Sequence, residues 1–147
     1  MNPSAFVLLL GLASCGFGAT TDGVDGEPLA GCAVTDGDTI HCGDEKIRLL
    51  GIDAPETRGC RPGRRCAPGD GQASTRSLEQ AMNGGALTII RLGTDDYGRT
   101  LALVAAGGRD LSCHQLKAGQ AIYREDWDNG RAVAGRCPQA ARAASAR

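Results

Sequence analysis

Three short apolar segments joined by tight turns constrain the fold of this chain more than any other feature. They cover residues 32–35, 39–42 and 46–52, and the last is rich in branched side chains. Asp36-Gly37-Asp38 and Gly43-Asp44 separate them. An Asp-Gly pair between two apolar runs is typical of a β-hairpin turn. The sequence therefore predicts an antiparallel three-stranded meander.

The rest of the chain alternates helical and extended patterns after a long loop over residues 57–71. In chain order, the predicted elements are a helix over 72–82, strands over 86–92 and 100–105, a helix over 110–117, an extended piece over 121–123 and a last short helix from Pro138. Together with the meander, this order predicts an α+β fold. We expect a five-stranded antiparallel β-barrel of the OB-fold type with about three short helices.

Seven cysteines in 147 residues indicate an oxidising compartment. Cys32 and Cys42 are equidistant from Gly37 and would face each other across the first hairpin, where a disulfide can form. Cys60 and Cys66 are placed to close the long loop. Six cysteines allow many pairings, so the sequence leaves the connectivity open.

The remaining cysteines are Cys113 and Cys137, whose bridge would tie the second helix to the start of the third, and Cys15 near the N-terminus. Residues 5–13 (AFVLLLGLA) are too short to span a bilayer, which needs about 20 residues, but have the length of a signal-peptide core. They run into Leu12-Ala13-Ser14-Cys15, which resembles a bacterial lipobox.

The N-terminal pattern predicts export to the periplasm or cell envelope, or secretion. Residues 1–14 would be a removed signal peptide, and a lipid on Cys15 would be the only membrane attachment. Cleavage by an ordinary signal peptidase near Gly18 or Ala19 is the alternative. Gly-rich residues 15–31 are expected to form a flexible tether, and residues 32–147 the folded domain.

Two carboxylates fall at adjacent strand ends of the predicted meander. Asp38 lies at the exit of the first turn, and Asp53 lies just past the third strand. Calcium binds oxygen ligands, including backbone carbonyls and water. His41 and His114 are isolated in the sequence, so no zinc-type spacing competes with this interpretation. The sequence predicts a site for a hard cation here.

Three motifs together resemble the signature of the staphylococcal nuclease (thermonuclease) family. They are Asp-Gly-Asp-Thr at 36–39, Arg-Leu-Leu-Gly-Ile-Asp-Ala-Pro-Glu at 48–56 and Asp-Asp-Tyr-Gly-Arg at 95–99. Their order and spacing agree with the family over roughly residues 32–125. The resemblance implies a monomeric calcium-dependent nuclease. It would hydrolyse the phosphodiester bonds of DNA and RNA, preferably single-stranded, with little sequence specificity.

The resemblance also assigns roles around the metal. Asp38, Asp53 and the backbone oxygen of Ala54 would be ligands of Ca²⁺. Many members of the family have Thr at the position of Ala54, and a carbonyl ligand does not need that hydroxyl. Glu56 would orient or deprotonate the attacking water.

Four further residues receive substrate roles from the resemblance. Arg48 and Arg99 would bind the scissile phosphate with forked donors and stabilise charge in the transition state. Tyr97 would touch a phosphate of the nucleotide, and Tyr123 would border its base. Ordinary packing is the alternative for both tyrosines. Trp127 is expected to cover the core rather than stack on a base.

The formal net charge is -1, so binding of a polyanion must depend on local clusters of basic residues. The long loop supplies one such cluster: Arg58, Arg61, Arg64 and Arg65. It can steer phosphate backbones or simply be a solvated loop.

Two other functions are compatible with the sequence. One is a non-catalytic OB-fold envelope protein that binds nucleic acid. The other is a structural envelope lipoprotein. Five residues have catalytic or metal-binding roles that depend on their side chains. All five are present, which favours the enzyme. They are Asp38, Arg48, Asp53, Glu56 and Arg99.

Overall fold

The computed structural model describes residues 25–145 and contains the predicted meander. Its strands are β2 (Cys32–Asp36), β3 (Thr39–Cys42) and β4 (Glu45–Leu49), and both pairings are antiparallel. Asp36 pairs with Thr39, so Gly37 and Asp38 form the turn between β2 and β3. The turn therefore places Asp38 at the end of the meander, as predicted.

The sheet curls because one bent segment of chain supplies both of its edges. Its strand order is β1-β6-β7-β4-β3-β2, with β1 (Glu27–Leu29), β6 (Leu87–Thr94) and β7 (Thr100–Ala106). β1 and β2 lie at opposite edges although only Ala30 and Gly31 separate them in the chain. Gly31 adopts a φ of 67°, which lets the chain bend there. The α+β class and the OB-type arrangement are confirmed.

One pairing differs from the wholly antiparallel barrel expected from the sequence. β4 and β7 are parallel, with Arg48 opposite Leu101. A long connection that includes a helix separates these two strands, and such a crossover permits parallel pairing. Two short strands, β5 (Ile52–Asp53) and β9 (Ile122–Tyr123), form a separate antiparallel pair, and β8 (Arg109–Asp110) pairs antiparallel with the end of β7.

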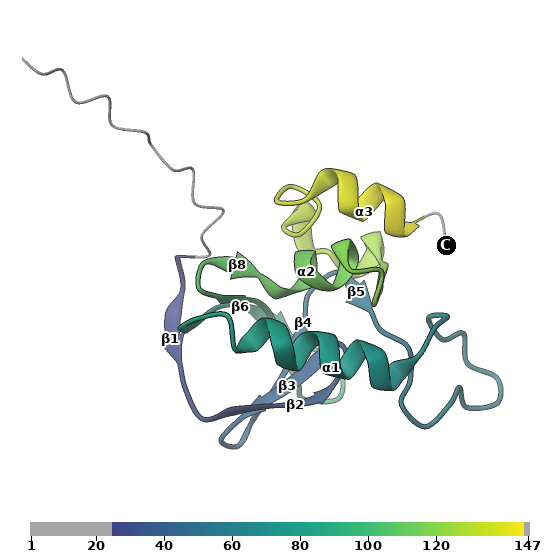
Figure 1. Ribbon diagram of the computed structural model, residues 1–147, viewed down its shortest axis with the longest axis horizontal. Helices are drawn as coiled ribbons and strands as arrows, with labels where there is room; N and C mark the ends of the chain where they lie inside the picture. Colours follow the sequence, from purple (N-terminus) through teal and green to yellow (C-terminus); the bar gives the residue numbers. More distant parts are fainter. Residues whose placement is uncertain (1–24, 146–147) are drawn as a thin grey trace, which may run out of the picture.

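Two helices pack on the curled sheet, and a third lies beyond them against the second helix (Figure 1). α1 (Gly71–Met82) packs on β2 and on α2 (Leu111–Lys117), and α2 packs on α3 (Pro138–Ser145). Two short 3-10 turns, Glu125–Trp127 and Asn129–Arg131, precede α3. Between helices and sheet lies a core of buried aliphatic side chains, which includes Ile40, Ile47, Leu49, Leu78 and Val104.

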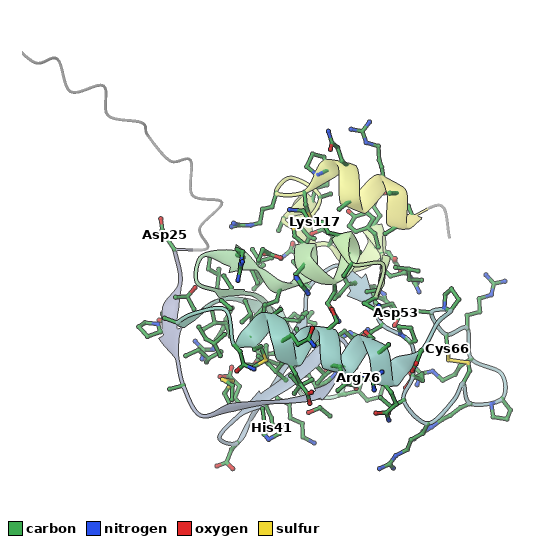
Figure 2. All side chains as sticks on the ribbon, in the orientation of Figure 1. Asp25, His41, Asp53, Cys66, Arg76 and Lys117 are labelled. Carbon is green, nitrogen blue, oxygen red and sulfur yellow. A yellow bond between two sulfur atoms is a disulfide. The ribbon has the colours of Figure 1, made fainter. Side chains whose placement is uncertain are left out.

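Three disulfides link the pairs that the sequence brought forward as candidates. They are Cys32–Cys42, Cys60–Cys66 and Cys113–Cys137. The first joins directly opposite residues of β2 and β3, as expected from their distances to Gly37. In Figure 2 the bridge at Cys66 is visible in the loop that extends beyond α1.

The N-terminal predictions lie mostly outside the described residues. These predictions are the signal peptide at 1–14, lipidation of Cys15 and the tether up to residue 24. Within the range assigned to the tether, β1 pairs with β6, so the ordered part begins before Cys32. Within residues 25–145, no helix has the length and apolar character needed to cross a membrane.

Candidate active site

A cavity of about 910 Å³ opens where the β2–β3 turn, β4 and the segment after β5 meet. Most of the residues singled out from the sequence line it. These are Asp38, Arg48, Asp53, Ala54, Glu56, Tyr97 and Arg99. The structure thus brings together residues that are up to 61 positions apart in the chain.

Asp38 is held in the cavity by several hydrogen bonds. Its side chain is almost fully buried, and its Oδ2 accepts a hydrogen bond from the backbone N–H of Ala54 at 2.8 Å. Its Oδ1 accepts from the hydroxyl of Thr39 at 2.9 Å and from Nη1 of Arg48 at 3.1 Å. Since β3 and β4 pair Thr39 with Arg48, strand register alone places the guanidinium beside this carboxylate.

The turn that carries Asp38 is fixed from behind by the helices. A Cβ on Gly37 would collide with the side chain of Ser74 in α1, so only glycine fits there. Gly37 does not adopt a positive φ, so its role is close packing. Its carbonyl accepts a hydrogen bond from Nε2 of the buried Gln115 in α2 at 2.7 Å. The position of Asp38 therefore depends on both helices.

Arg48 connects the two predicted metal-binding carboxylates. Its Nη1 contacts Asp38, and its Nη2 lies 3.3 Å from Oδ1 of Asp53. A second arginine, Arg124, lies 3.7 Å from Oδ2 of Asp53. Asp53 is placed by β5, whose pairing with β9 sets it opposite Ile122. The two carboxylates thus converge, as predicted, and share one guanidinium.

The local electrostatics show an excess of negative charge. Burial and the nearby charge of Asp38 raise the pKa of Asp36 to about 6. Burial and the charge of Asp38 also raise the pKa of Asp53, against the opposing effect of Arg48 and Arg124. A cation placed among these carboxylates would relieve their mutual repulsion. Their hard oxygen atoms are the donor type that calcium prefers.

The described part of the chain supplies few ligands for such a cation. Among residues 25–145, no group of three or more His, Cys, Asp or Glu side chains is clustered as a metal site. A bound calcium ion would therefore depend on Asp38, Asp53, a backbone oxygen such as that of Ala54, and water. This donor set fits calcium, which accepts mixed oxygen ligands, and fits zinc poorly.

Arg99 belongs to a tight turn that Asp95 organises. The Oδ1 of Asp95 accepts from the backbone N–H groups of Tyr97 and Arg99, both at 2.9 Å, and Gly98 has a φ of 76°. The Oδ2 of Asp95 binds Nε and Nη2 of Arg99 at 2.7 Å. Burial opposes ionisation of Asp95, but these hydrogen bonds outweigh it and lower the pKa. The motif thus fixes both the backbone and the guanidinium.

Glu56 lies exposed on the cavity wall. The backbone around it is close-packed, because a Cβ on Gly71 would collide with the carbonyl of Glu56. The start of α1 therefore fixes the position of Glu56. Asp70 caps that helix by accepting from the N–H groups of Gln72 and Ala73.

The aromatic residues depart in part from the sequence-based expectation. Tyr97 is 82% exposed on the cavity rim, where a substrate can reach it. Tyr123 is buried and does not line the cavity, and its hydroxyl donates to Asp128 at 2.8 Å, which fits the packing role that the sequence left as the alternative. Trp127, expected over the core, is 38% exposed and lines the cavity.

Two cavity features were missed by the sequence reasoning. The guanidiniums of Arg48 and Arg124 lie 4.9 Å and 4.1 Å from the ring centroid of Trp127. Asp36, regarded from sequence as a turn residue only, lines the cavity and also accepts from the N–H of Asp38. The position of Arg124, three residues before Trp127, was the only local signal for the first.

The fold and the cavity define an OB-type domain whose site combines clustered carboxylates with arginines. The chain belongs to the staphylococcal nuclease homologue family, whose sequence profile matches residues 46–146. That range contains Arg48, Asp53, Glu56 and Arg99 and begins after Asp38.

Three curated relatives are similar to this chain. A succinoglycan biosynthesis protein (ExoI) of Rhizobium meliloti is 33% identical over 75% of the chain and 59% of its own length. An uncharacterized endonuclease of Haemophilus influenzae is 32% identical over 60% and 47%, respectively. The thermonuclease of Staphylococcus intermedius is 36% identical over 70% and 62%. The matches thus span about half to three fifths of the relatives' lengths.

Proposed function

We propose that this protein is a calcium-dependent nuclease that hydrolyses phosphodiester bonds of DNA and RNA with little sequence specificity. One observation carries the proposal. In a chain of this family, two converging carboxylates, a third exposed carboxylate and two arginines line one cavity. Relatives named as a thermonuclease and an endonuclease support the reaction class.

Asp38, Asp53 and the backbone oxygen of Ala54 would hold the calcium ion. When bound, calcium would polarise the phosphate and position water without strongly acidifying it. Asp38 is already oriented by three hydrogen bonds, so little reorganisation of the protein is needed at this ligand.

Glu56 is the group we assign to the water. Its carboxylate is exposed in the cavity and, among residues 25–145, makes no ion pair. A carboxylate in that state can accept a proton from water as the phosphorus–oxygen bond forms. The proton then resides on a Glu56 oxygen, the bond between phosphorus and the leaving oxygen breaks, and the leaving oxygen keeps that electron pair and takes a proton from solvent water.

Arg48 and Arg99 would bind the non-bridging phosphate oxygens. Arg99 uses Nε and Nη2 for Asp95, which leaves Nη1 to donate to a phosphate. Arg48 is shared between Asp38 and Asp53, and its other face lies on Trp127. Both guanidiniums are thus held in place before substrate binds, which favours charge stabilisation in the transition state.

Cleavage of single-stranded DNA, duplex DNA and RNA by the full chain, with calcium or with chelator, tests this proposal. Glu56→Gln should lower the rate by roughly 10²–10⁴-fold, and Arg99→Ala by roughly 10²–10³-fold. The matched controls are Glu79→Gln and Arg76→Ala, which change exposed side chains of α1 outside the cavity. Their rates should be unchanged.

Two results would overturn the proposal. The first is no calcium-dependent cleavage of any of the three substrates by a folded chain. The second is an equal rate for Glu56→Gln and its control. Binding of nucleic acid without cleavage would instead support the non-catalytic OB-fold alternative. Circular dichroism of each variant separates loss of chemistry from loss of fold.

We also propose that the protein is exported as a monomer, with Cys15 lipidated in the cell envelope. Three disulfides in the domain are consistent with an oxidising compartment. The mass of the native N-terminal peptide tests this. A mature chain that starts at Cys15 with a lipid mass supports anchoring, whereas a start near Gly18 or Ala19 indicates secretion without an anchor.

A further inference from the structure

The loop between β5 and α1 contains a small closed ring. A disulfide joins Cys60 to Cys66, six positions apart. At its tip, the N–H of Arg64 donates to the carbonyl of Arg61 at 3.1 Å, and Gly63 has a φ of 79°. Proline at the second position and a positive-φ glycine at the third are the requirements of a type II turn. The segment Arg61-Pro62-Gly63-Arg64 meets them.

The ring has little conformational freedom for an exposed loop. The ring of Pro62 fixes its φ, Gly63 already has the conformation that the turn needs, and the disulfide closes the ends. Its C-terminal side is anchored by Ala67, which is buried. Arg61 and Arg64 stand at the first and last positions of the turn, so their Cα atoms lie close together on one element.

The two turn arginines differ from the other two arginines of the loop. Arg61 and Arg64 line the cavity, whereas Arg58 and Arg65 do not. All four are exposed, and within residues 25–145 none of them forms an ion pair with a carboxylate. The loop therefore contains two arginine pairs of equal charge, and only one of these pairs lines the cavity.

The charge of the cavity makes these two side chains important. Seven acidic and five basic side chains line it. Two of the basic ones, Arg48 and Arg99, are already paired with carboxylates. A polyanion that enters such a cavity meets net repulsion unless unpaired cations compensate. Within residues 25–145, three basic side chains of the cavity have no carboxylate partner. Arg61 and Arg64 belong to the ring, and the third is Lys46.

We propose that the Cys60–Cys66 ring is a phosphate-binding element of the site. Arg61 and Arg64 contact backbone phosphates of a single strand beyond the phosphate that reacts. The disulfide holds both side chains at the cavity rim, so the affinity for the strand depends on the oxidation state of this cysteine pair. The inference rests on the proposed nuclease function and adds the residues that bind the strand outside the reacting centre.

Binding of a labelled single-stranded oligonucleotide by the full chain in chelator tests the arginines without cleavage. The double variant Arg61→Ala/Arg64→Ala should weaken binding by roughly tenfold at low salt. It should also reduce the slope of log affinity against log salt by about 1.4, since each phosphate contact on a single strand contributes about 0.7. Arg58→Ala/Arg65→Ala, which removes the same charge, should change the slope by less than half as much.

The disulfide is tested by Cys60→Ser/Cys66→Ser, with Cys32→Ser/Cys42→Ser as the control for loss of a bridge elsewhere. The two closed loops are of similar length, so both variants should lower the melting temperature by similar amounts. In binding measured well below unfolding, the first should weaken the affinity several-fold, and the second should keep it. Arg61→Lys/Arg64→Lys should keep most of the salt slope, because the charge is retained.

Equal effects of the two arginine pairs would overturn the inference, as would undiminished binding by Cys60→Ser/Cys66→Ser. Either result leaves the proposed function standing if the unchanged chain still cleaves with calcium. A folded chain that neither binds the oligonucleotide nor cleaves it refutes the proposed function as well. The two failures are therefore distinguishable in one set of samples.

Discussion

Removal of the Asp128 carboxylate should strongly destabilise the fold beside the site while leaving the assigned site residues intact. Asp128 is 4% exposed. It accepts from the N–H groups of Val133 at 2.8 Å and Ala134 at 2.9 Å, and from the hydroxyl of Tyr123 at 2.8 Å. It thus links β9 to the segment that leads into α3.

The magnitude follows from these three bonds. A hydrogen bond to a charged group contributes about 1.5–3 kcal/mol. Asp128→Ala leaves three donors without an acceptor, and because such terms overlap we expect a loss of roughly 4–5 kcal/mol. Tyr123→Phe removes one donor and should cost about 1–2 kcal/mol, or roughly 5 °C in melting temperature. Tyr97→Phe, on the exposed rim, is the matched control and should cost nothing measurable.

Urea unfolding followed by circular dichroism and by Trp127 fluorescence, with disulfides intact, measures these losses. If the Tyr123–Asp128 bond exists, the loss in the double variant should be smaller than the sum of the single losses by about 1–3 kcal/mol. Additivity within about 0.5 kcal/mol would refute the bond. A fall in activity of folded Tyr123→Phe, with unchanged stability, would return Tyr123 to a substrate-binding role.

The pH dependence gives an independent check on Tyr123. Burial, the hydrogen bond to Asp128 and the charge of Asp128 raise its pKa to about 12. The folded pKa lies above the unfolded value of about 10, so the folded state holds the phenol proton more tightly. This stabilisation is complete below pH 10 and is lost as the pH rises towards 12. The difference in stability between the unchanged chain and Tyr123→Phe should therefore shrink over that interval.

Three further predictions concern a disulfide, an ion pair and an aromatic residue. Cys113→Ser/Cys137→Ser should lower the free energy of unfolding by about 3.5 kcal/mol in the chain-entropy treatment of a loop of this length, and a loss below about 1 kcal/mol in urea unfolding would contradict it. Hydrogen bonds from Arg91 lower the pKa of Glu45 from 4.5 to about 2, so the stabilisation by the Glu45 carboxylate is present above pH 4.5 and lost as the pH falls towards 2. Glu45→Gln should therefore reduce the loss of unfolding free energy over this pH interval, and an unchanged loss would show that the ion pair has no such role. Trp127→Ala should reduce kcat/KM by a few-fold to tenfold, since each guanidinium on the ring is worth about 0.5–1 kcal/mol, whereas Trp127→Phe should keep most of the activity.

The features predicted correctly from the sequence are those with local signals. The meander follows from turn residues between apolar runs, and the pairing of Cys32 with Cys42 follows from their distances to Gly37. The turn around Arg99 has local causes of the same kind, an acceptor at Asp95 and a positive φ at Gly98. In each case the cause lies within a few positions of the effect.

The features that could not be predicted depend on docking between distant segments. Tyr123 and Trp127 are four positions apart, and the sequence did not decide whether Tyr123 packs in the core and placed Trp127 over the core rather than in the cavity. Pairing of β9 with β5 turns Tyr123 inward opposite Ile52, and the following 3-10 turn carries Trp127 to the cavity. The local sequence pattern of this segment does not indicate where the segment packs in the fold. The parallel pairing of β4 with β7 escaped prediction for the same reason.

The firm placement of Asp38 combines both kinds of information. In front, its carboxylate is held by Thr39 and Ala54, which belong to the recognisable motifs. Behind the turn, Nε2 of Gln115 donates to the carbonyl of Gly37, 78 positions away in the chain. A polar residue in a helix normally faces solvent, so its sequence gives no sign of this contact. The carboxylate is therefore oriented by β3, by the segment after β5 and by the helices α1 and α2 before any ligand arrives, and a site that stabilises developing charge requires that orientation in advance.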